Sequence, residues 1–294
     1  MLDGAANRWF RPSDVCVAPD GSVVVADWYD PGVGGHRMQD VEHGRLFRVT
    51  PVGQSASYKA PPQDFTTPEG CVKALLNPNL ATRFIAWTAL QEMGARAEPA
   101  LAKVYNDSRD PRHRARALWL LSKITGRTEQ YVKLAAADAD ANIRIMAVRI
   151  VRQTKGSVIP VVQKLVRDSS PQVRREAALA LRHQHESEAA GLWAELAMQH
   201  DGKDRWYLEA LGISADGQWD TFLAAWQKRA GDKWNTPAGR DIVWRSRAKQ
   251  TPMLLAKIVT DPNTPPETQP RYFRAFDFLS GAEKDTALKS ILGQ

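Results

Sequence analysis

Apolar and polar positions recur with one spacing through most of the chain, from about Asn79 to Leu279. Each recurrence contains an arginine, and in most of them apolar residues follow three and seven positions later, as with Ala147 and Val151 after Arg144. Residues spaced in this way lie on one face of an amphipathic helix. The arginines follow one another at steps of 31, 30, 30, 31, 35 and 31 residues: Arg83, Arg114, Arg144, Arg174, Arg205, Arg240 and Arg271. A fixed period of this length predicts a repeat architecture.

The beginning of each predicted helix is marked four residues before its arginine. These positions are Asn79, Asp110, Asp140, Ser170, Asp201, Thr236 and Glu267. Six of the seven are residue types that cap a helix by accepting a bond from a free backbone N–H, and proline follows three of them at the first helical position. Thirty residues leave room for a second helix in each unit. The pattern therefore predicts a mainly α fold, an αα-superhelix in which helical hairpins stack as a solenoid.

The first 62 residues have a different pattern. Residues 13–18, 22–27 and 44–50 alternate polar and apolar positions or are rich in β-branched residues, and Pro19-Asp20-Gly21 is a turn signal. They predict three strands, the first two joined as a hairpin. The glycine-rich link between residues 28 and 43 is a predicted loop, and a proline-rich linker follows the third strand. We therefore expect two domains: residues 1–62 with a small antiparallel β segment, and residues 63–294 with the solenoid.

The repeat resembles a known family. Three segments carry the resemblance: Asp110-Pro111-x-x-Arg114, Asp140-x-x-x-Arg144 and Ser170-Pro171-x-x-Arg174. They are similar to short HEAT repeats of the kind found in phycobilisome lyases. The resemblance covers about three quarters of the chain. It implies a HEAT-like, armadillo-like fold, but function depends on the sites that a fold carries.

The β segment resembles the last blade of a propeller. The residues that carry the resemblance are Phe10 to Val15, Pro19 to Ser22, Ala26 to Asp30, Gly34 to His36 and Gly44 to Pro51. They are similar to the propeller of membrane-bound dehydrogenases of planctomycete-type bacteria, related to quinoprotein sugar dehydrogenases, in which HEAT-type repeats follow the propeller. The resemblance implies that this chain is the C-terminal fragment of a larger protein of the periplasm or cell envelope, with a β-propeller encoded before Met1.

The repeating arginines have two interpretations, phosphate binding and a structural ladder. An arginine one turn inside a capped helix can pair with an aspartate of the neighbouring repeat, and such pairs fix the stacking register of a solenoid. We favour the ladder, because a periodic residue is best explained by periodic packing. Its predicted members are Arg83, Asp110, Arg114, Asp140, Arg144, Arg174, Asp201 and Arg205.

One loop concentrates potential metal ligands. Its oxygen and imidazole groups could hold Ca²⁺ or another divalent ion. The candidate ligands are Asp27, Asp30, His36 and Asp40, with His43 nearby. The favoured interpretation is turn chemistry, in which aspartates bond to their own backbone. Cys16 and Cys71 have no metal-ligand spacing, and the sequence does not predict a disulfide between them.

The longest step of the period places extra residues near 230–239, with Trp234 among them. An irregular loop that carries an aromatic residue is a candidate partner contact. The alternative is that Trp234 belongs to the packed core, as its large apolar area favours.

Charge and motifs reduce the functional classes to two. The sequence has no Ser–His–Asp or Cys–His arrangement and no glycine-rich phosphate loop after a strand, so we expect a non-catalytic interaction scaffold without a cofactor, with other proteins or domains of the parent chain as partners. The alternative is nucleic-acid binding, because residues 95–190 contain 18 Lys and Arg against 10 Asp and Glu. No apolar run reaches the length of a transmembrane helix.

Overall fold

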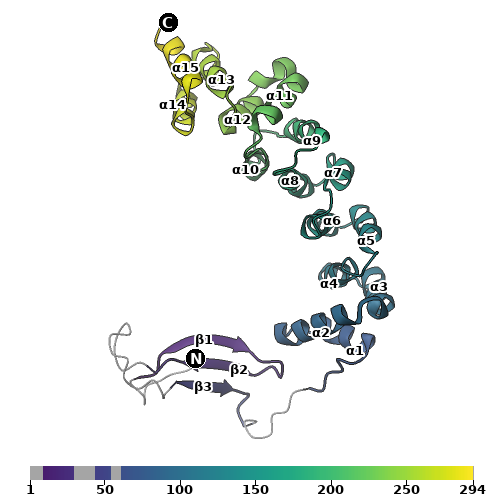
Figure 1. Cartoon of the computed structure of the whole chain (residues 1–294). Coiled ribbons are helices and arrows are strands. Elements are labelled where there is room, and N and C mark those ends of the chain that lie inside the picture. Colours follow the sequence, from purple (N-terminus) through teal and green to yellow (C-terminus); the bar gives the residue numbers. More distant parts are fainter. Residues whose placement is uncertain (1–8, 30–43, 54–60, 294) are drawn as a thin grey trace. The chain divides into compact units, whose positions relative to one another are not determined.

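The computed structural model describes residues 9–29, 44–53 and 61–293. The chain forms two compact units, Met1–Gly126 and Arg127–Gln294. In their described parts, the first unit contains a small sheet and helices, and the second consists of helices (Figure 1). None of the described helices combines the length and the hydropathy of a bilayer-spanning segment.

The sheet of the first unit has three antiparallel strands in the order β1-β2-β3 (Figure 1): β1 covers Pro12–Val17, β2 Val23–Asp27 and β3 Arg45–Val49. Val25 is paired with Val15 on one side and Phe47 on the other. These three side chains share one face, because cross-strand partners point the same way. Val25 is buried, whereas Val15 is exposed. Within the described residues, β1 and β3 each pair along one edge only.

The turn between β1 and β2 contacts the first helices. The side chain of Asn79 donates from Nδ2 to the carbonyl of Ala18 at 2.7 Å, and Thr82 Oγ1 donates to the carbonyl of Pro19 at 3.2 Å. The Oδ1 atom of Asn79 also accepts the backbone N–H groups of Ala81 and Thr82, as a helix cap. One side chain therefore both begins a helix and holds the sheet to it.

The helices of the first unit pack as two pairs. The α1 helix packs against α2, and α3 packs against α4. Thr67 and Asp110 cap α1 and α4, and proline occupies the first position of both. The bounds are α1 Pro68–Leu75, α2 Leu80–Met93, the 3-10 helix η2 Gly94–Ala97, α3 Glu98–Asp107 and α4 Pro111–Leu121.

The second unit stacks helical pairs in two layers (Figure 1). One layer contains α6, α8 and α10, which contact one another in succession, and the other contains α5, α7, α9 and α11. Further helices, α12 to α15, continue the stack. The bounds are α5 Thr128–Ala136, α6 Ala141–Gln153, α7 Ile159–Leu165, α8 Pro171–Ala180, α9 Ser187–Ala197, α10 Arg205–Ser214, α11 Trp219–Ala230, η3 Gly231–Asn235, α12 Pro237–Arg245, α13 Thr251–Thr260, η4 Pro266–Thr268, α14 Gln269–Ala275, η5 Phe276–Phe278 and α15 Ala282–Leu292.

Small and aromatic residues fill the space between these layers. Ala147 and Ala177, three residues after their arginines, are fully buried and let neighbouring helices approach closely. Trp193 and Trp226 are the largest fully buried side chains of the described residues, and Trp193 packs against Trp219 and Phe222. Its Nε1 donates to the carbonyl of Leu211 and to the hydroxyl of Ser214, so the buried indole is satisfied.

The predicted fold class is confirmed: the chain is mainly α, with stacked helical pairs and a small N-terminal antiparallel sheet. The proposed division into residues 1–62 and 63–294 stays a prediction; the sheet and α1 to α4 lie in one compact unit. The residues added by the longest repeat step, predicted as an irregular loop, form the 3-10 helix η3.

Three predicted caps differ in detail. The α10 helix begins at Arg205, and Asp204 caps it by accepting the N–H of Tyr207, because Asp204 directly precedes the helix. Asp201 instead accepts the N–H groups of the turn before it. Ser170 occupies the cap position of α8 without a capping bond, and α14 begins after Thr268, not Glu267.

Gly239 should be intolerant of any side chain. A Cβ atom there would lie 2.3 Å from the carbonyl oxygen of Trp234 and 2.6 Å from that of Lys233, so η3 would have to move away from α12. We expect Gly239→Ala to lower the free energy of unfolding by about 1–3 kcal/mol, measured by urea denaturation.

Gly191→Ala is the matched control, since a Cβ at that helical position meets no atom within 4 Å. Alanine should there stabilise the protein by roughly 0.5–1 kcal/mol through helix propensity. Equal effects of the two substitutions would show that the approach of η3 to α12 is not as close as described.

Candidate functional site

Asp27 is the one member of the predicted metal cluster that lies in the described residues; Asp30, His36 and Asp40 lie outside them. Its carboxylate is buried and accepts bonds from the backbone N–H groups of Arg11 and Tyr29 and from the side chain of Arg45. Burial by itself would raise the pKa of Asp27, but these donors outweigh it and lower the pKa. Asp27 therefore acts here as a turn and ion-pair residue. No group of three or more His, Cys, Asp or Glu ligands gathers in the described part of the chain.

Arg144, at the start of α6, joins three segments of the second unit. Its Nε and Nη2 donate to the two carboxylate oxygens of Asp168 at 2.6 and 2.8 Å, and Nη1 donates to the carbonyls of Asp138 and Ala139, both at 2.9 Å. The carbonyls belong to the loop before α6 and Asp168 to the loop before α8. The bidentate pair is largely shielded from solvent, with side-chain exposures of 14% and 7%.

The electrostatics of this pair follow from its burial. Loss of solvent, the largest influence, would raise the pKa of Asp168, but the hydrogen bonds from Arg144 and from the N–H of Ser170 outweigh it and lower the pKa. The bonds to Asp168 likewise raise the pKa of Arg144. Both groups are therefore charged at neutral pH.

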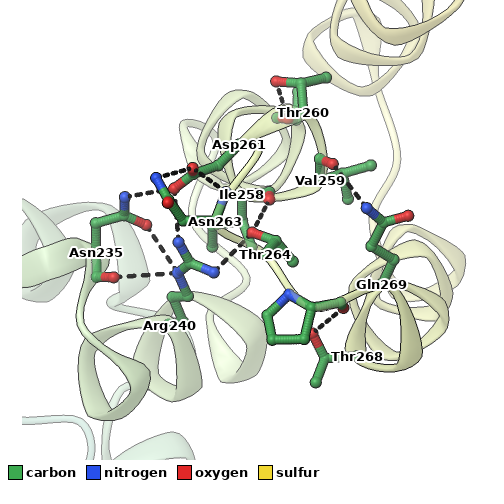
Figure 2. Close-up of polar contacts among 12 residues, drawn as sticks. Asn235, Arg240, Ile258, Val259, Thr260, Asp261, Asn263, Thr264, Thr268 and Gln269 are labelled. Atoms are coloured by element: carbon green, nitrogen blue, oxygen red, sulfur yellow. Dashed lines mark hydrogen bonds and ion pairs between the residues drawn. The ribbon is translucent and has the colours of Figure 1, made fainter.

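The same geometry recurs with different partners. Arg174 donates from Nη1 to the carbonyls of Asp168 and Ser169, and its guanidinium lies over the ring of Tyr207 at 5.5 Å. Arg240 is bound to the carbonyl of Asn235, to Asp261 at 2.7 Å and to Thr264 at 2.7 Å (Figure 2). Each arginine thus fixes the loop before its own helix and reaches toward the next helical pair.

The other predicted ladder residues have different environments. Arg114 donates from Nε to the carbonyl of Tyr105, and the buried Nε of Arg83 has no hydrogen-bond partner among the described residues. Asp110 and Asp140 accept backbone N–H groups as caps of α4 and α6. Arg144 meets Asp168, in the loop before α8, and not the cap aspartate of a neighbouring helix.

Ion pairs connect successive helical hairpins of the second unit. They are more numerous than the arginine period predicts, which has one arginine in each hairpin. Their partners are 21 to 36 residues apart in the sequence, so each pair crosses from one hairpin to the next. The pairs are Arg144–Asp168, Arg149–Glu176, Arg152–Glu176, Arg167–Glu195, Arg175–Asp204, Arg182–Asp216, Arg229–Glu195, Arg240–Asp261, Arg245–Glu209 and Arg271–Asp241.

A surface of α10, α12 and α14 combines arginines with tryptophan; we name Arg205, Trp206, Glu209, Trp244 and Arg271 the Trp244 face. The guanidinium groups of Arg205 and Arg271 lie over the Trp244 ring, at 5.3 and 4.3 Å from its centroid. Arg205 also pairs with Glu209 at 2.6 Å. Trp206, which follows Arg205 on α10, is 71% exposed.

Two carboxylates hold the arginines of this region in place. Glu209 accepts bonds from Arg205 and Arg245, and Asp241 pairs with Arg271 and the buried His200. Burial, the largest influence on both carboxylates, acts to raise their pKa values, but hydrogen bonds from Arg245 and from His200 lead the opposing effects and lower them. The face therefore carries ordered charges on a fixed aromatic base.

Trp234 is half-buried in η3, and its backbone packs against Gly239 of α12. The more exposed tryptophan is Trp206. The sequence did not predict three residues of this surface as site residues: Trp206, Trp244 and Arg271. The available signal was the cluster of tryptophans at 193–244 together with the arginine period, which places Arg205 and Arg271 at equivalent helical positions.

Comparison with known proteins supports the repeat assignment. A model of HEAT repeats matches residues 128–212, which run from α5 into α10. The resemblance to HEAT repeats is thus confirmed for this stretch. No curated protein matches the chain. The crystal structure of an engineered protein is similar at a TM-score of 0.37 and 17% identity, over 76% of this chain and 71% of that one, and a likeness at this level supports no argument about function.

We expect Arg144→Ala to lower the free energy of unfolding by about 1–3 kcal/mol at pH 7, because Asp168 and two carbonyls lose their donors. The folded-state pKa of Asp168 is lowered, so the contribution of the pair is complete above about pH 4 and is lost as the pH falls through the folded pKa. The difference between wild type and variant should therefore shrink between pH 7 and pH 3. Urea denaturation at both pH values measures it.

Arg167→Ala is the control for this substitution. Arg167 also pairs with a carboxylate of the next hairpin, Glu195, but its side chain is 74% exposed. An exposed pair contributes at most about 1 kcal/mol. A cost of Arg144→Ala no greater than that of Arg167→Ala would exclude the structural role of Arg144.

Proposed function

We propose that the chain is a non-catalytic scaffold that binds other proteins through its stacked helices. The observation that carries this proposal is the Trp244 face. Tryptophan and arginine are the residue types that contribute most to binding energy at protein interfaces. Here Trp206 is exposed and follows Arg205 on α10. Arg205 pairs with Glu209 and Arg271 with Asp241, and both lie over Trp244.

The order of this surface favours binding. An interface that must first immobilise long side chains loses affinity, at a cost of about 0.5–1.5 kcal/mol for each. Arg205 and Arg271 each pair with one carboxylate and lie over the Trp244 ring, so their conformational freedom is already reduced in the unbound chain. The HEAT repeats of residues 128–212 supply the extended helical support on which such a surface is presented.

The alternative, nucleic-acid binding, is weakened by where the carboxylate partners lie. Six arginines between residues 144 and 182 pair with carboxylates of the next hairpin. Several of those carboxylates, Glu195, Asp204 and Asp216, lie beyond residue 190 in the sequence. The excess of basic residues counted along residues 95–190 therefore overstates the positive charge available to phosphates.

We expect no sequence-specific DNA binding by the full chain, and only weak binding that is lost by about 200 mM salt. Fluorescence anisotropy with labelled duplexes of two unrelated sequences measures both properties. Submicromolar affinity that persists at that salt concentration would favour the nucleic-acid function over the scaffold.

We further propose that this scaffold is the C-terminal part of a larger membrane-bound dehydrogenase-like protein of the periplasm or cell envelope, with repeats of the phycobilisome-lyase type. The sheet supports a connection to further strands: Val15, Val17 and Leu46 are exposed, and open strand edges invite additional strands. Neighbouring domains of the parent chain would then be partners. The genomic sequence before the codon for Met1 tests this, since a reading frame without propeller-type strands would contradict the proposal.

The scaffold function is tested by a photo-crosslinking residue in place of Trp206 in the full chain. We expect it to form an adduct with one defined protein in the native cell, identified by mass spectrometry. Trp206→Ala should then reduce the affinity of the purified partner at least about tenfold, as expected for an interface hot spot. The same crosslinker at Lys228, an exposed position on α11, is the control. Adducts of equal yield and identity at both positions would contradict a role for the Trp244 face.

A further inference from the structure

We propose that a groove on the layer opposite the Trp244 face receives one acidic amphipathic helix of a partner protein. The groove lies between α5, α7 and the loop that follows α6, and has a volume of about 750 Å³. Its apolar lining consists of Val132, Ala136, Val151, Pro160 and Val161. This surface is separate from the Trp244 face, so the inference stands independently of the function proposed above.

The rim of this groove is positively charged. Lys133 and Lys164 line it, against the single carboxylate Glu129. Lys155 is not part of the lining but lies between the rim residues Thr154 and Gly156 in the sequence. Lys133 pairs with Glu129 at 2.7 Å, but no ion pair of Lys155 or Lys164 occurs among the described residues. Two lysines therefore remain available for carboxylates of a partner.

The backbone holds one of these lysines in an unfavourable conformation. Lys155 has φ of +57°, in the left-handed region where glycine is the usual residue after a helix. A lysine there costs roughly 1 kcal/mol relative to glycine. His183, in the turn after α8, has φ of +60°, so this conformation recurs in the turns that follow these helices.

A comparable groove in the first unit has the opposite balance of charge. It lies between α1 and α3, has a volume of about 590 Å³, and is lined by Glu69 and Asp107 against the single cation Lys103. Grooves of this kind are thus a general product of stacked helices, whereas the charge on the rim is specific to each. The basic rim between α5 and α7 selects for an anionic occupant.

The shape of the groove favours a helix over a compact small molecule. Small-molecule sites typically enclose about 70–90% of the ligand surface, whereas this groove is about half open to solvent. A helix needs only one apolar face buried, with residues at i, i+3, i+4 and i+7 as anchors. Two neighbouring helices also form the kind of groove into which the side-chain ridge of a third helix packs.

The test uses synthetic, fluorescein-labelled helical peptides of about 18 residues, a length at which isolated helices begin to be stable. The first peptide has leucine at the i, i+3, i+4, i+7 positions and glutamate elsewhere. The second replaces each glutamate by lysine, and the third keeps the glutamates but replaces each leucine by serine. Anisotropy titrations with the full chain at 150 mM salt should show that the first peptide binds at least about tenfold more tightly than either other peptide.

Two variant pairs locate the binding. Val132→Glu places a carboxylate in the groove and should abolish binding of the first peptide, whereas Leu134→Glu, on the same helix but outside the lining, should not change it. The double variant Lys155→Glu/Lys164→Glu should weaken binding about tenfold or more. Lys228→Glu/Lys257→Glu, which makes the same change in net charge at exposed positions elsewhere, should leave it unchanged.

Circular dichroism of each variant establishes that it is folded. Equal binding of the acidic and basic peptides, or wild-type binding by both Val132→Glu and the Lys155→Glu/Lys164→Glu double variant, would overturn the proposal. The Trp206→Ala variant leaves this groove intact, so we expect it to bind the first peptide as wild type does. This result separates the test of the groove from that of the Trp244 face.

Discussion

The second unit depends on arginine side chains that cross from one helical hairpin to the next. In a stack of hairpins each unit contacts only its neighbours, so no central core holds distant parts together. The loops between hairpins also expose backbone carbonyls that need donors. Arg144 meets both requirements, since it binds the carbonyls of Asp138 and Ala139 and the carboxylate of Asp168. Arg240 does the same around Asn235 and Asp261. Each junction is thereby fixed in register.

This use of arginine shapes the surfaces that remain for partners. Basic side chains that pair with the next hairpin are withdrawn from contact with phosphates, whereas Arg205 and Arg271 lie over Trp244 at the surface. The opposite layer has lysines instead, at the rim of an apolar groove. The two surfaces therefore offer different chemistry: guanidinium groups over an aromatic ring in one, and ammonium groups beside aliphatic side chains in the other.

The candidate site was predictable in part. The period located Arg144, Arg174 and Arg240, because a residue that recurs with the helix pattern must occupy equivalent positions in each hairpin. It did not identify Asp168 or Asp261 as their partners, since these aspartates lie in loops whose path depends on how the hairpins stack. The predicted pairing with a cap aspartate differs for Arg144, whose carboxylate partner is Asp168, two residues before the cap position Ser170 of α8.

What the sequence by itself determined is local. The spacing of apolar residues predicts helices, and the patterns of residues 13–18, 22–27 and 44–50 predict strands. The 30-residue period predicts a stack of hairpins. Each of these follows from the geometry of a short stretch of backbone. What only the tertiary structure decided is which distant groups meet: Trp244 with Arg205 and Arg271, Glu176 with two arginines of α6, and α5 with α7 around an open groove. These contacts depend on how one hairpin packs on the next. The period predicts that each hairpin packs on its neighbour. The interdigitation of side chains at each junction then sets which residues touch.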